Sequence, residues 1–489
     1  MERSIVRNIF INFAGAVAPT FVSLVTVPAY IHLLGAARYG VINLVWTLIG
    51  YFSVLDLGTS LATENQIAKA RAATDDSIER IFWSAWFMNL GTGIVGGVLI
   101  YVGTIIYITH GVKIEPTFQH EVMASLPWIA AAVPIANVSW VFAGSLTGVE
   151  SFTSYNINQT IGTALFQLFP LAAIFMFSAS LAVVIPACVI ARFVGGLMLG
   201  VAAFRALGIR RLRLPQWHLM AELFRYGRWM LMFSGANMIA STLDRVLIGA
   251  LLGARFVTYY ATPQNLVTRL NLLPGAMART LFPRLSAASR ADADALAHSS
   301  LAFLNGAFTP CVIVALFALK PFLLLWLGPT MAASAPVASV LILGVWLAGQ
   351  SSLLGILIQA QANPAFVAGV SWLQLPFFAG ALWCAIHWFG LMGAAVVVVL
   401  KALLDYSILL AFAKLHVWSI VRNMLAHLAF LIVALVLADS IGALPVAIVV
   451  GLALTAANFG MSLHGSSELR AAFYKAWTRF VPSTKQAEG

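Results

Sequence analysis

Seven ionisable side chains lie inside long apolar stretches of this 489-residue chain. On insertion scales a charged side chain at the centre of a bilayer costs roughly 2.5 kcal/mol or more, so seven of them facing lipid would cost on the order of 17 kcal/mol. Each must therefore face an opposite charge or a water-filled cavity. The seven residues are Asp56, Arg192, Asp244, Arg245, Arg269, Lys401 and Asp405.

Three of these residues are arginines, and their chemistry suits the binding of anions. A guanidinium group donates two parallel hydrogen bonds to a phosphate or a carboxylate, and it keeps its proton inside a protein. We therefore predict that Arg192, Arg245 and Arg269 bind an anionic group of a ligand. The alternative for each is an ion pair between helices.

The remaining deep charges predict pairs. Asp244 and Arg269 lie on neighbouring antiparallel helices, each roughly 13 Å from the same face of the membrane at 1.5 Å per residue, so the two can meet. Lys401 and Asp405 are four residues apart, share one face of a helix and are expected to neutralise each other.

Asp56 lies towards the cytoplasmic end of its predicted helix. We expect it to act as a gate or to form a salt bridge to Arg279 or Arg284 in the second half of the chain. Binding of a coupling cation is the alternative role for this carboxylate.

Uncharged polar side chains continue along the predicted helix that carries Arg269. Gln264 and Asn271 recur at helical spacing with a threonine between them, and Asn265 lies four residues before Arg269. We predict that they line a polar path for a ligand, with hydrogen bonding between helices as the alternative. The three cysteines show no metal-ligand spacing, so no metal, disulfide or cofactor is predicted.

The elements that carry these residues are predicted to be membrane-spanning helices. Of the residues, 61% are hydrophobic and 9% are charged, whereas an ordinary soluble domain has about 25% charged residues. Fourteen apolar runs are long enough to cross a bilayer, so we predict an all-α polytopic membrane protein with about 14 transmembrane helices. The runs are 9–34, 41–66, 81–109, 122–148, 157–178, 181–204, 229–252, 260–283, 299–326, 336–361, 364–387, 390–413, 424–439 and 444–463.

The distribution of the 28 lysines and arginines predicts the orientation of the helices. With a cytoplasmic N-terminus, 20 of them fall on the cytoplasmic side and only four on the other. The positive-inside rule then places both termini in the cytoplasm and requires an even number of helices, which 12 also satisfies. The net charge of +11 is explained by this topology, so no nucleic-acid partner is predicted.

A repeat predicts two lobes. The stretch LLGAARYG at 33–40 returns as LLGARFVTYY at 251–260, an offset of 251 − 33 = 218 residues, and both copies join two helices at the external face. Two copies in one orientation indicate two pseudo-symmetric six-helix lobes with a site between them. A chance match between turns that contain glycine is the alternative.

The predicted domain boundaries follow from this plan. Residues 205–228 form a basic cytoplasmic linker, and 464–489 form a cytoplasmic amphipathic tail. Both segments combine basic and large apolar side chains, which is typical of helices that lie on an anionic membrane surface. The transmembrane parts are the N-lobe at 1–204, the C-lobe at 229–413 and two further helices at 414–463.

Two long stretches resemble a known family. Residues 28–70 and 243–286 are similar to the bacterial polysaccharide-export flippases, the O-antigen and exopolysaccharide translocases of the multidrug/oligosaccharidyl-lipid/polysaccharide exporter superfamily. The most specific features are LDLG at 55–58, DRVLIGALLG at 244–253 and LFPRLS at 281–286. The resemblance fades after about residue 300.

This resemblance implies a V of two helical lobes in the bacterial cytoplasmic (inner) membrane. The implied substrate is an oligosaccharide repeat unit carried on undecaprenyl diphosphate and moved to the periplasmic leaflet by alternating access. On this resemblance, the three arginines would bind the diphosphate or the anionic part of the glycan, and the polar side chains beside Arg269 would line the path of the glycan. Some relatives use a proton or sodium gradient. In the related peptidoglycan-precursor flippases, arginines of helices 1, 2 and 8 line the cavity, and here only Arg269 matches that pattern at depth.

Two other functions are alternatives to a flippase for a protein of this composition. A drug or cation antiporter of the same superfamily would need deep acidic residues, whereas the deep charges here are four basic and three acidic. A membrane polysaccharide polymerase or ligase would need a large external loop and a catalytic cluster, and the sequence shows neither. A transporter rather than an enzyme is therefore predicted, with a polymerase or a glycosyltransferase as a partner protein.

Overall fold

The structure is a computed structural model, and the regular secondary structure of its described residues is helical. It describes residues 2–52, 59–72, 78–110, 116–209, 211–361, 364–413, 415, 417–441, 443–465 and 470. Over these residues it has fourteen α-helices and no strand. Ten of the described helices are long and apolar enough to cross a membrane. The predicted class, an all-α protein that crosses the membrane several times, is confirmed.

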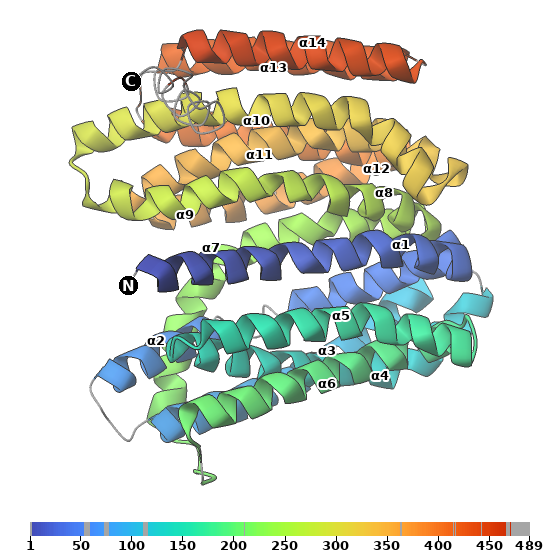
Figure 1. The fold of residues 1–489 in the computed structure, drawn as a ribbon. Helices are drawn as coiled ribbons and strands as arrows, with labels where there is room; N and C mark the ends of the chain where they lie inside the picture. The colour runs from blue at the N-terminus through green and yellow to red at the C-terminus, as the bar shows by residue number, and fades with distance from the viewer. Residues whose placement is uncertain are drawn as a thin grey trace, which may run out of the picture. The chain divides into compact units, whose positions relative to one another are not determined.

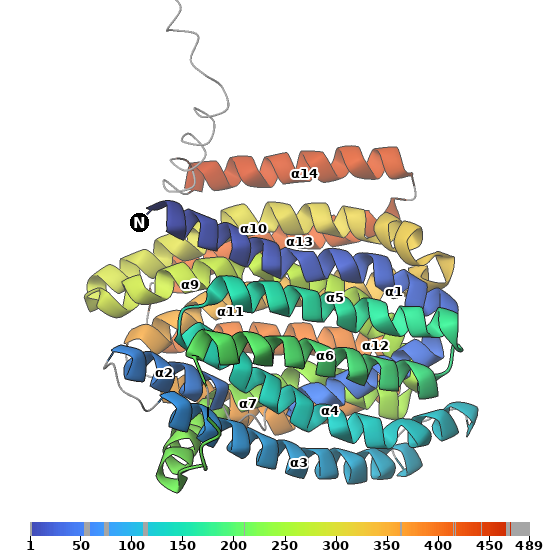
Figure 2. The same cartoon turned by 60° about the horizontal axis from the view of Figure 1, so that its bottom comes forward.

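The chain divides into two compact units, Met1–Thr258 and Tyr259–Gly489. In the first unit, α3 packs against α4, and α6 packs against both α4 and α5 (Figures 1 and 2). Its helices are α1 (Glu2–Phe52), α2 (Thr59–Ala72), α3 (Ile78–His110), α4 (Pro116–Gly148), α5 (Phe152–Met176), α6 (Leu181–Leu207), α7 (Trp217–Leu251) and the start of α8 (Ala254–Val267).

Aromatic side chains form a core at one end of the first unit. Phe82 of α3 is fully buried, and its ring packs against Phe142 of α4 and Phe204 of α6 at centroid distances of 6.1 and 5.3 Å. Trp83 joins them through an edge contact with Phe82 at 5.4 Å. Aromatic pairs in such arrangements add about 0.5–1.5 kcal/mol beyond the area that they bury, so this core holds α3, α4 and α6 together.

In the second unit, α10 packs against α11, α13 and α14, and α11 packs most extensively against α12. Trp346 of α11 is fully buried and donates a hydrogen bond of 3.0 Å from Nε1 to Thr309 of α10. The remaining helices are α9 (Leu272–Ala287), α10 (Arg290–Leu327), α11 (Ala335–Gln361), α12 (Pro364–Ala413), α13 (Val417–Ser440) and α14 (Leu444–Gly465), with 3-10 turns η2 (Thr268–Asn271) and η3 (Pro329–Ser334).

Single glycines divide two of the long helices. Gly35 in α1 has φ +79° and ψ 161°, and Gly390 in α12 has φ 59° and ψ −140°. Only glycine adopts such angles without steric cost, and α1 changes direction along its length (Figure 1). The predicted pair at 364–387 and 390–413 corresponds to the two parts of α12, which meet at Gly390.

The predicted continuous helix at 260–283 is wrong. It is α8, then the 3-10 turn η2, then α9. Pro274 lies in the first turn of α9, where its missing N–H leaves the carbonyl of the preceding turn without a helical partner. A break at this place is consistent with that chemistry, and it means that Arg269 lies in η2 rather than inside an α-helix.

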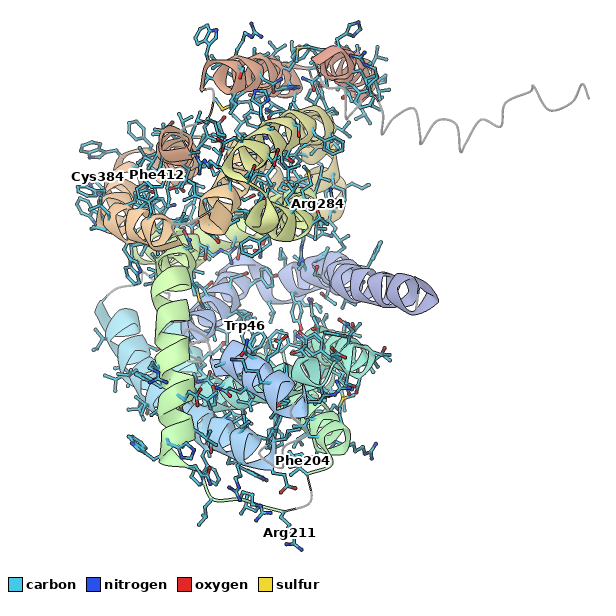
Figure 3. The ribbon with its side chains drawn as sticks, turned by 90° about the vertical axis from the view of Figure 1, so that its left-hand side faces the viewer. Trp46, Phe204, Arg211, Arg284, Cys384 and Phe412 are labelled. Atoms are coloured by element: carbon cyan, nitrogen blue, oxygen red, sulfur yellow. The ribbon has the colours of Figure 1, made fainter. Side chains whose placement is uncertain are left out.

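The basic linker is shorter than the predicted 205–228. α6 continues to Leu207 and is capped by Gly208 in the left-handed conformation, and α7 begins at Trp217. Arg211 lies on this connection, away from the helices (Figure 3). Because α7 packs against α1, α2 and α3, it falls within the first compact unit. The assignment of this helix to a second lobe stays a prediction. Of the predicted amphipathic tail, only 464, 465 and 470 are among the described residues.

Candidate functional site in the first unit

Arg192 lies near the middle of α6, eleven residues after Leu181 and fifteen before Leu207. At 1.5 Å per residue it is about 16 Å from the nearer end of the helix. The large apolar side chains Phe193 and Leu197, on another face of α6, are 49% and 51% exposed. Arg192 is half-buried and lines a pocket together with residues of α4 and α5, so its guanidinium points into the unit and not towards lipid.

The pocket has a volume of about 240 Å³ and is formed by α4, α5 and α6. Glycines allow its walls to approach closely. A Cβ on Gly195 of α6 would lie 3.1 Å from the Cα of Gly162 on α5, and a Cβ on Gly196 would lie 2.6 Å from Oγ of Ser139 on α4. Small residues at helix contacts permit such approach in membrane proteins, and the helices diverge enough nearby to leave the hollow that Arg192 enters.

Polar side chains line this pocket around the arginine. Ser139 and Thr163 donate their hydroxyl hydrogens to carbonyls of their own helices, at 2.6 and 2.8 Å. Asn158 does the same with its amide N–H, to the carbonyl of Ser154 at 2.8 Å. The amide of Gln159 and the guanidinium of Arg192 have no hydrogen-bond partner among the described residues.

The charge on Arg192 is not compensated within the described part of the chain. The ion pairs there involve other residues, and no carboxylate lines the pocket. A guanidinium has five N–H donors and no acceptor. An unpaired guanidinium inside a membrane-spanning unit requires water or an anion. This site can therefore bind an anionic group of a ligand, and its amides can form hydrogen bonds with hydroxyl groups of the same ligand.

Asp244 and Arg245 are on α7, in the first unit. Asp244 is 2% exposed, and its Oδ1 accepts a hydrogen bond of 2.8 Å from the backbone N–H of Arg245. Arg245 is half-buried. The predicted partner of Asp244, Arg269, belongs to the second unit, so that pair stays a prediction.

The other predicted site residues near Arg269 are in the second unit and differ in exposure. Arg269 and Asn265 are exposed, Asn271 is half-buried, and Gln264 is 9% exposed. The break at η2 divides them between α8, η2 and the start of α9.

The predicted charge residues of α12 form an ion pair. Nζ of Lys401 lies 2.7 Å from Oδ2 of Asp405, one helical turn away, and 5.7 Å from the ring centroid of Phe378. Both charged side chains are largely buried. The pair neutralises two charges inside a membrane-spanning helix, and its role as a gate stays a prediction.

The proposed gate at Asp56 lies outside the described residues, as does the side chain of Arg279. Arg284 is exposed on α9 of the second unit (Figure 3). The salt bridge between Asp56 and one of these arginines therefore stays a prediction.

Sequence reasoning missed a charge network in the first unit. Nη2 of Arg38 lies 2.8 Å from Oε1 of Glu121, and Oε2 of Glu121 accepts a hydrogen bond of 2.8 Å from the backbone N–H of Leu181. The carboxylate thus joins α1 to α4 and caps the first turn of α6, where the helix dipole favours negative charge. No local spacing connects these three residues in the sequence.

Two buried glutamines of the second unit were also missed. Gln350 of α11 is 1% exposed and Gln374 of α12 is 7% exposed, and neither amide has a partner among the described residues. Each is an amide within an apolar run, and that isolation is the signal that could have found them.

The two copies of the repeat lie against each other within the first unit. A Cβ on Gly40 would be 1.7 Å from the carbonyl oxygen of Ala254, so only glycine fits there. Oγ1 of Thr258 donates a hydrogen bond of 2.7 Å to the carbonyl of Ala36. The turns that the repeat predicted are therefore in direct contact.

The amino-acid sequence matches a family model described as "Polysaccharide biosynthesis protein" over residues 5–289. A Shigella flexneri protein named "Putative O-antigen transporter" is 23% identical over 426 residues, which are 86% of this chain and 100% of that protein.

Two solved structures share the fold. The lipid II flippase MurJ in an inward closed conformation has a TM-score of 0.67 at 12% identity, over 94% of this chain and 99% of that chain. An inward-facing multidrug resistance MATE family transporter of the MOP superfamily has a TM-score of 0.66 at 12% identity, over 84% and 99%. At these identities the likeness concerns the fold.

Proposed function

The chain belongs to the polysaccharide biosynthesis protein family, and we propose that it is a flippase for lipid-linked oligosaccharides. It moves undecaprenyl-diphosphate-linked repeat units from the cytoplasmic to the periplasmic leaflet of the bacterial inner membrane, by alternating access. Its family, a relative named as an O-antigen transporter and the fold that it shares with a lipid II flippase support this function.

The observation that carries the proposal is the uncompensated arginine in a pocket of the first unit. Arg192 lies near the middle of a membrane-spanning helix and has no ion-pair partner among the described residues. A transporter retains such a costly charge when its cargo supplies the opposite one. The cargo of this chain is therefore anionic in the part that enters the membrane.

Arg245 and Arg269 keep their proposed role as contacts for the anionic parts of the cargo. Arg245 is on α7, which ends where the repeated turn at 251–260 begins, and Arg269 is on η2, which follows this turn along the chain after α8. Gln264, Asn265 and Asn271 extend the proposed glycan path in the second unit. Lys401 and Asp405 neutralise each other, so neither charge requires the cargo as a counter-ion.

The alternative is export of cationic drugs, since multidrug transporters share the fold. A cationic molecule would be repelled by Arg192, and no carboxylate lines the same pocket in the described chain. The charge of the pocket therefore favours the lipid-linked oligosaccharide.

The test is translocation in proteoliposomes of a fluorescent undecaprenyl-diphosphate oligosaccharide that contains an acidic sugar, scored by protection from an impermeant quencher. Wild type, Arg192→Ala and Arg269→Ala are compared, with cationic dyes as the rival cargo. We expect transfer by wild type, a loss of about tenfold or more in each variant, and no dye transport.

The loss reflects removal of hydrogen bonds to a charged group, about 1.5–3 kcal/mol. Each variant must keep the elution profile and the thermal stability of wild type. Dye transport together with absence of lipid transfer by well-folded wild type would assign the chain to the antiporter function instead.

A further inference from the structure

The pocket of α4, α5 and α6 has the chemistry of a site for one acidic sugar. We infer that it receives a sugar residue bearing a carboxylate, a hexuronic acid or a similar unit, from the transported oligosaccharide. This inference rests on the proposed function and names the class of glycan that the transporter selects.

The charge of the pocket favours a carboxylate over the diphosphate as its ligand. Arg192 is the one ionisable side chain among the described residues that line the pocket. A diphosphate linked at both ends carries two negative charges, so the single guanidinium of this pocket leaves one of them without a counter-charge. A sugar carboxylate carries one charge and forms a bidentate pair with one guanidinium.

The remaining lining matches the rest of a sugar ring. Trp140 is 38% exposed and presents an aromatic surface in the pocket, and Gln159 presents an amide with no partner in the described chain. Asn158 uses its N–H within its own helix and retains a carbonyl oxygen that can accept from a hydroxyl. A few convergent polar groups beside an aromatic wall are typical of sites for small polar ligands.

The position of the pocket also disfavours the lipid end of the cargo. Phe193, Val194 and Leu197, on other faces of α6, are 40–51% exposed, which is the pattern of a surface that meets acyl chains. Arg192 and Gly196 point to the opposite side, into the unit. The diphosphate is bonded directly to the polyprenyl chain and stays next to lipid, whereas a sugar further along the glycan reaches an interior pocket.

The experiment compares two lipid-linked oligosaccharides that are identical except for one residue, glucuronic acid in one and glucose in the other. Initial rates of translocation are measured in proteoliposomes for wild type, Arg192→Gln, Arg192→Lys and Arg205→Gln. Arg205 is the matched control because it is on the same helix, exposed and outside this pocket.

Wild type and Arg205→Gln are expected to move the acidic cargo at least about tenfold faster than the neutral one, the effect of a hydrogen bond to a charged group. Arg192→Gln is expected to bring this ratio to about one while transport of the neutral cargo continues. Arg192→Lys keeps the charge but loses the bidentate geometry, and an intermediate ratio is expected.

Equal rates for the two cargoes in wild type would overturn the inference. So would a folded Arg192→Gln that slows both cargoes equally, because Arg192 would then act on the shared diphosphate.

A second measurement separates this inference from the proposed function. If wild type moves neither cargo, the function fails, and the pocket is tested by the thermal stability of the detergent-purified protein in free glucuronate, glucose or inorganic phosphate. Stabilisation by glucuronate alone, abolished in Arg192→Gln and kept in Arg205→Gln, supports the acidic-sugar site. Equal stabilisation by phosphate, or none by glucuronate, contradicts it.

Discussion

Charged residues inside the membrane-spanning part of this chain are compensated in different ways. Lys401 and Asp405 neutralise each other within one helix. Glu121 is held by Arg38 and by the N-terminus of α6. Arg192 has neither kind of partner among the described residues. An arginine without a partner therefore indicates a binding site better than a charge that is already paired.

Removal of the carboxylate of Glu121 is expected to destabilise the first unit. Glu121→Ala loses charged hydrogen bonds to Arg38 and to the N–H of Leu181, each worth about 1.5–3 kcal/mol. We expect a clear fall in Tm, measured by thermal unfolding in detergent. Glu150→Ala is the control, since its contact with Arg71 is 3.5 Å long and exposed and contributes about 0–1 kcal/mol. Equal Tm values for the two variants would refute the structural role of Glu121.

Lys401→Met is expected to leave the carboxylate of Asp405 unpaired in a membrane span. The expected loss of stability is about 2.5–3.5 kcal/mol, the cost of an isolated charge at this depth. Lys401→Met combined with Asp405→Leu removes both charges and is expected to recover more than half of the loss. Thermal unfolding of Lys401→Met, Asp405→Leu and the double variant measures this cycle, and simple additivity of the two single changes would show that the pair does not interact.

At the scale of elements, glycines decide where the helices turn and how closely they approach. Gly35 and Gly390 permit reversals of one residue inside α1 and α12. Gly40 permits contact between the two copies of the repeat. The reason that glycine is needed differs: the first two positions have a positive φ, and the third has no space for a side chain.

Gly40→Ala is expected to force α1 away from the start of α8. Its methyl group would lie 1.7 Å from the carbonyl oxygen of Ala254, so the helices must separate by more than 1 Å, at a typical cost of about 1–3 kcal/mol. Gly91→Ala in α3 meets no atom within 4 Å and is expected to be neutral or to stabilise by up to about 1 kcal/mol. Thermal unfolding compares the two, and a Gly40→Ala variant as stable as Gly91→Ala would show that this contact is loose.

At the scale of the whole molecule, topology follows from charge. The described chain contains ten helices that can cross a membrane, and the basic residues gather on the side that we assign to the cytoplasm. The chain belongs to the polysaccharide biosynthesis protein family and shares its fold with a lipid II flippase and a multidrug transporter. An orientation with both termini in the cytoplasm completes the proposed path from cytoplasm to periplasm.

This orientation is tested with reporters fused to each end of the full chain. A fluorescent protein that matures only in the cytoplasm is expected to fluoresce at both termini, and alkaline phosphatase, active only in the periplasm, is expected to be inactive at both. A phosphatase fusion after Lys320, on the predicted external side, is expected to be active and serves as the positive control. Opposite results at the two ends would require an odd number of spans.

Much of the fold was predictable because the period and length of apolar runs depend on local sequence. The predicted runs at 336–361 and 444–463 agree with α11 and α14 to within two residues. The run at 260–283 was wrong because hydropathy does not register the backbone break before Pro274. The predicted break between 387 and 390, in contrast, agrees with the turn at Gly390.

The sequence by itself determined that the chain is helical, crosses the membrane several times and holds Arg192 at mid-span, since composition and spacing within one helix suffice for these conclusions. Only the tertiary structure decided that Arg192 shares a pocket with Trp140 and Gln159 and lacks a partner in the described chain. Contacts between helices far apart in sequence depend on packing, which no local pattern encodes. The same reason explains why the pair of Arg38 and Glu121 emerged only from the fold.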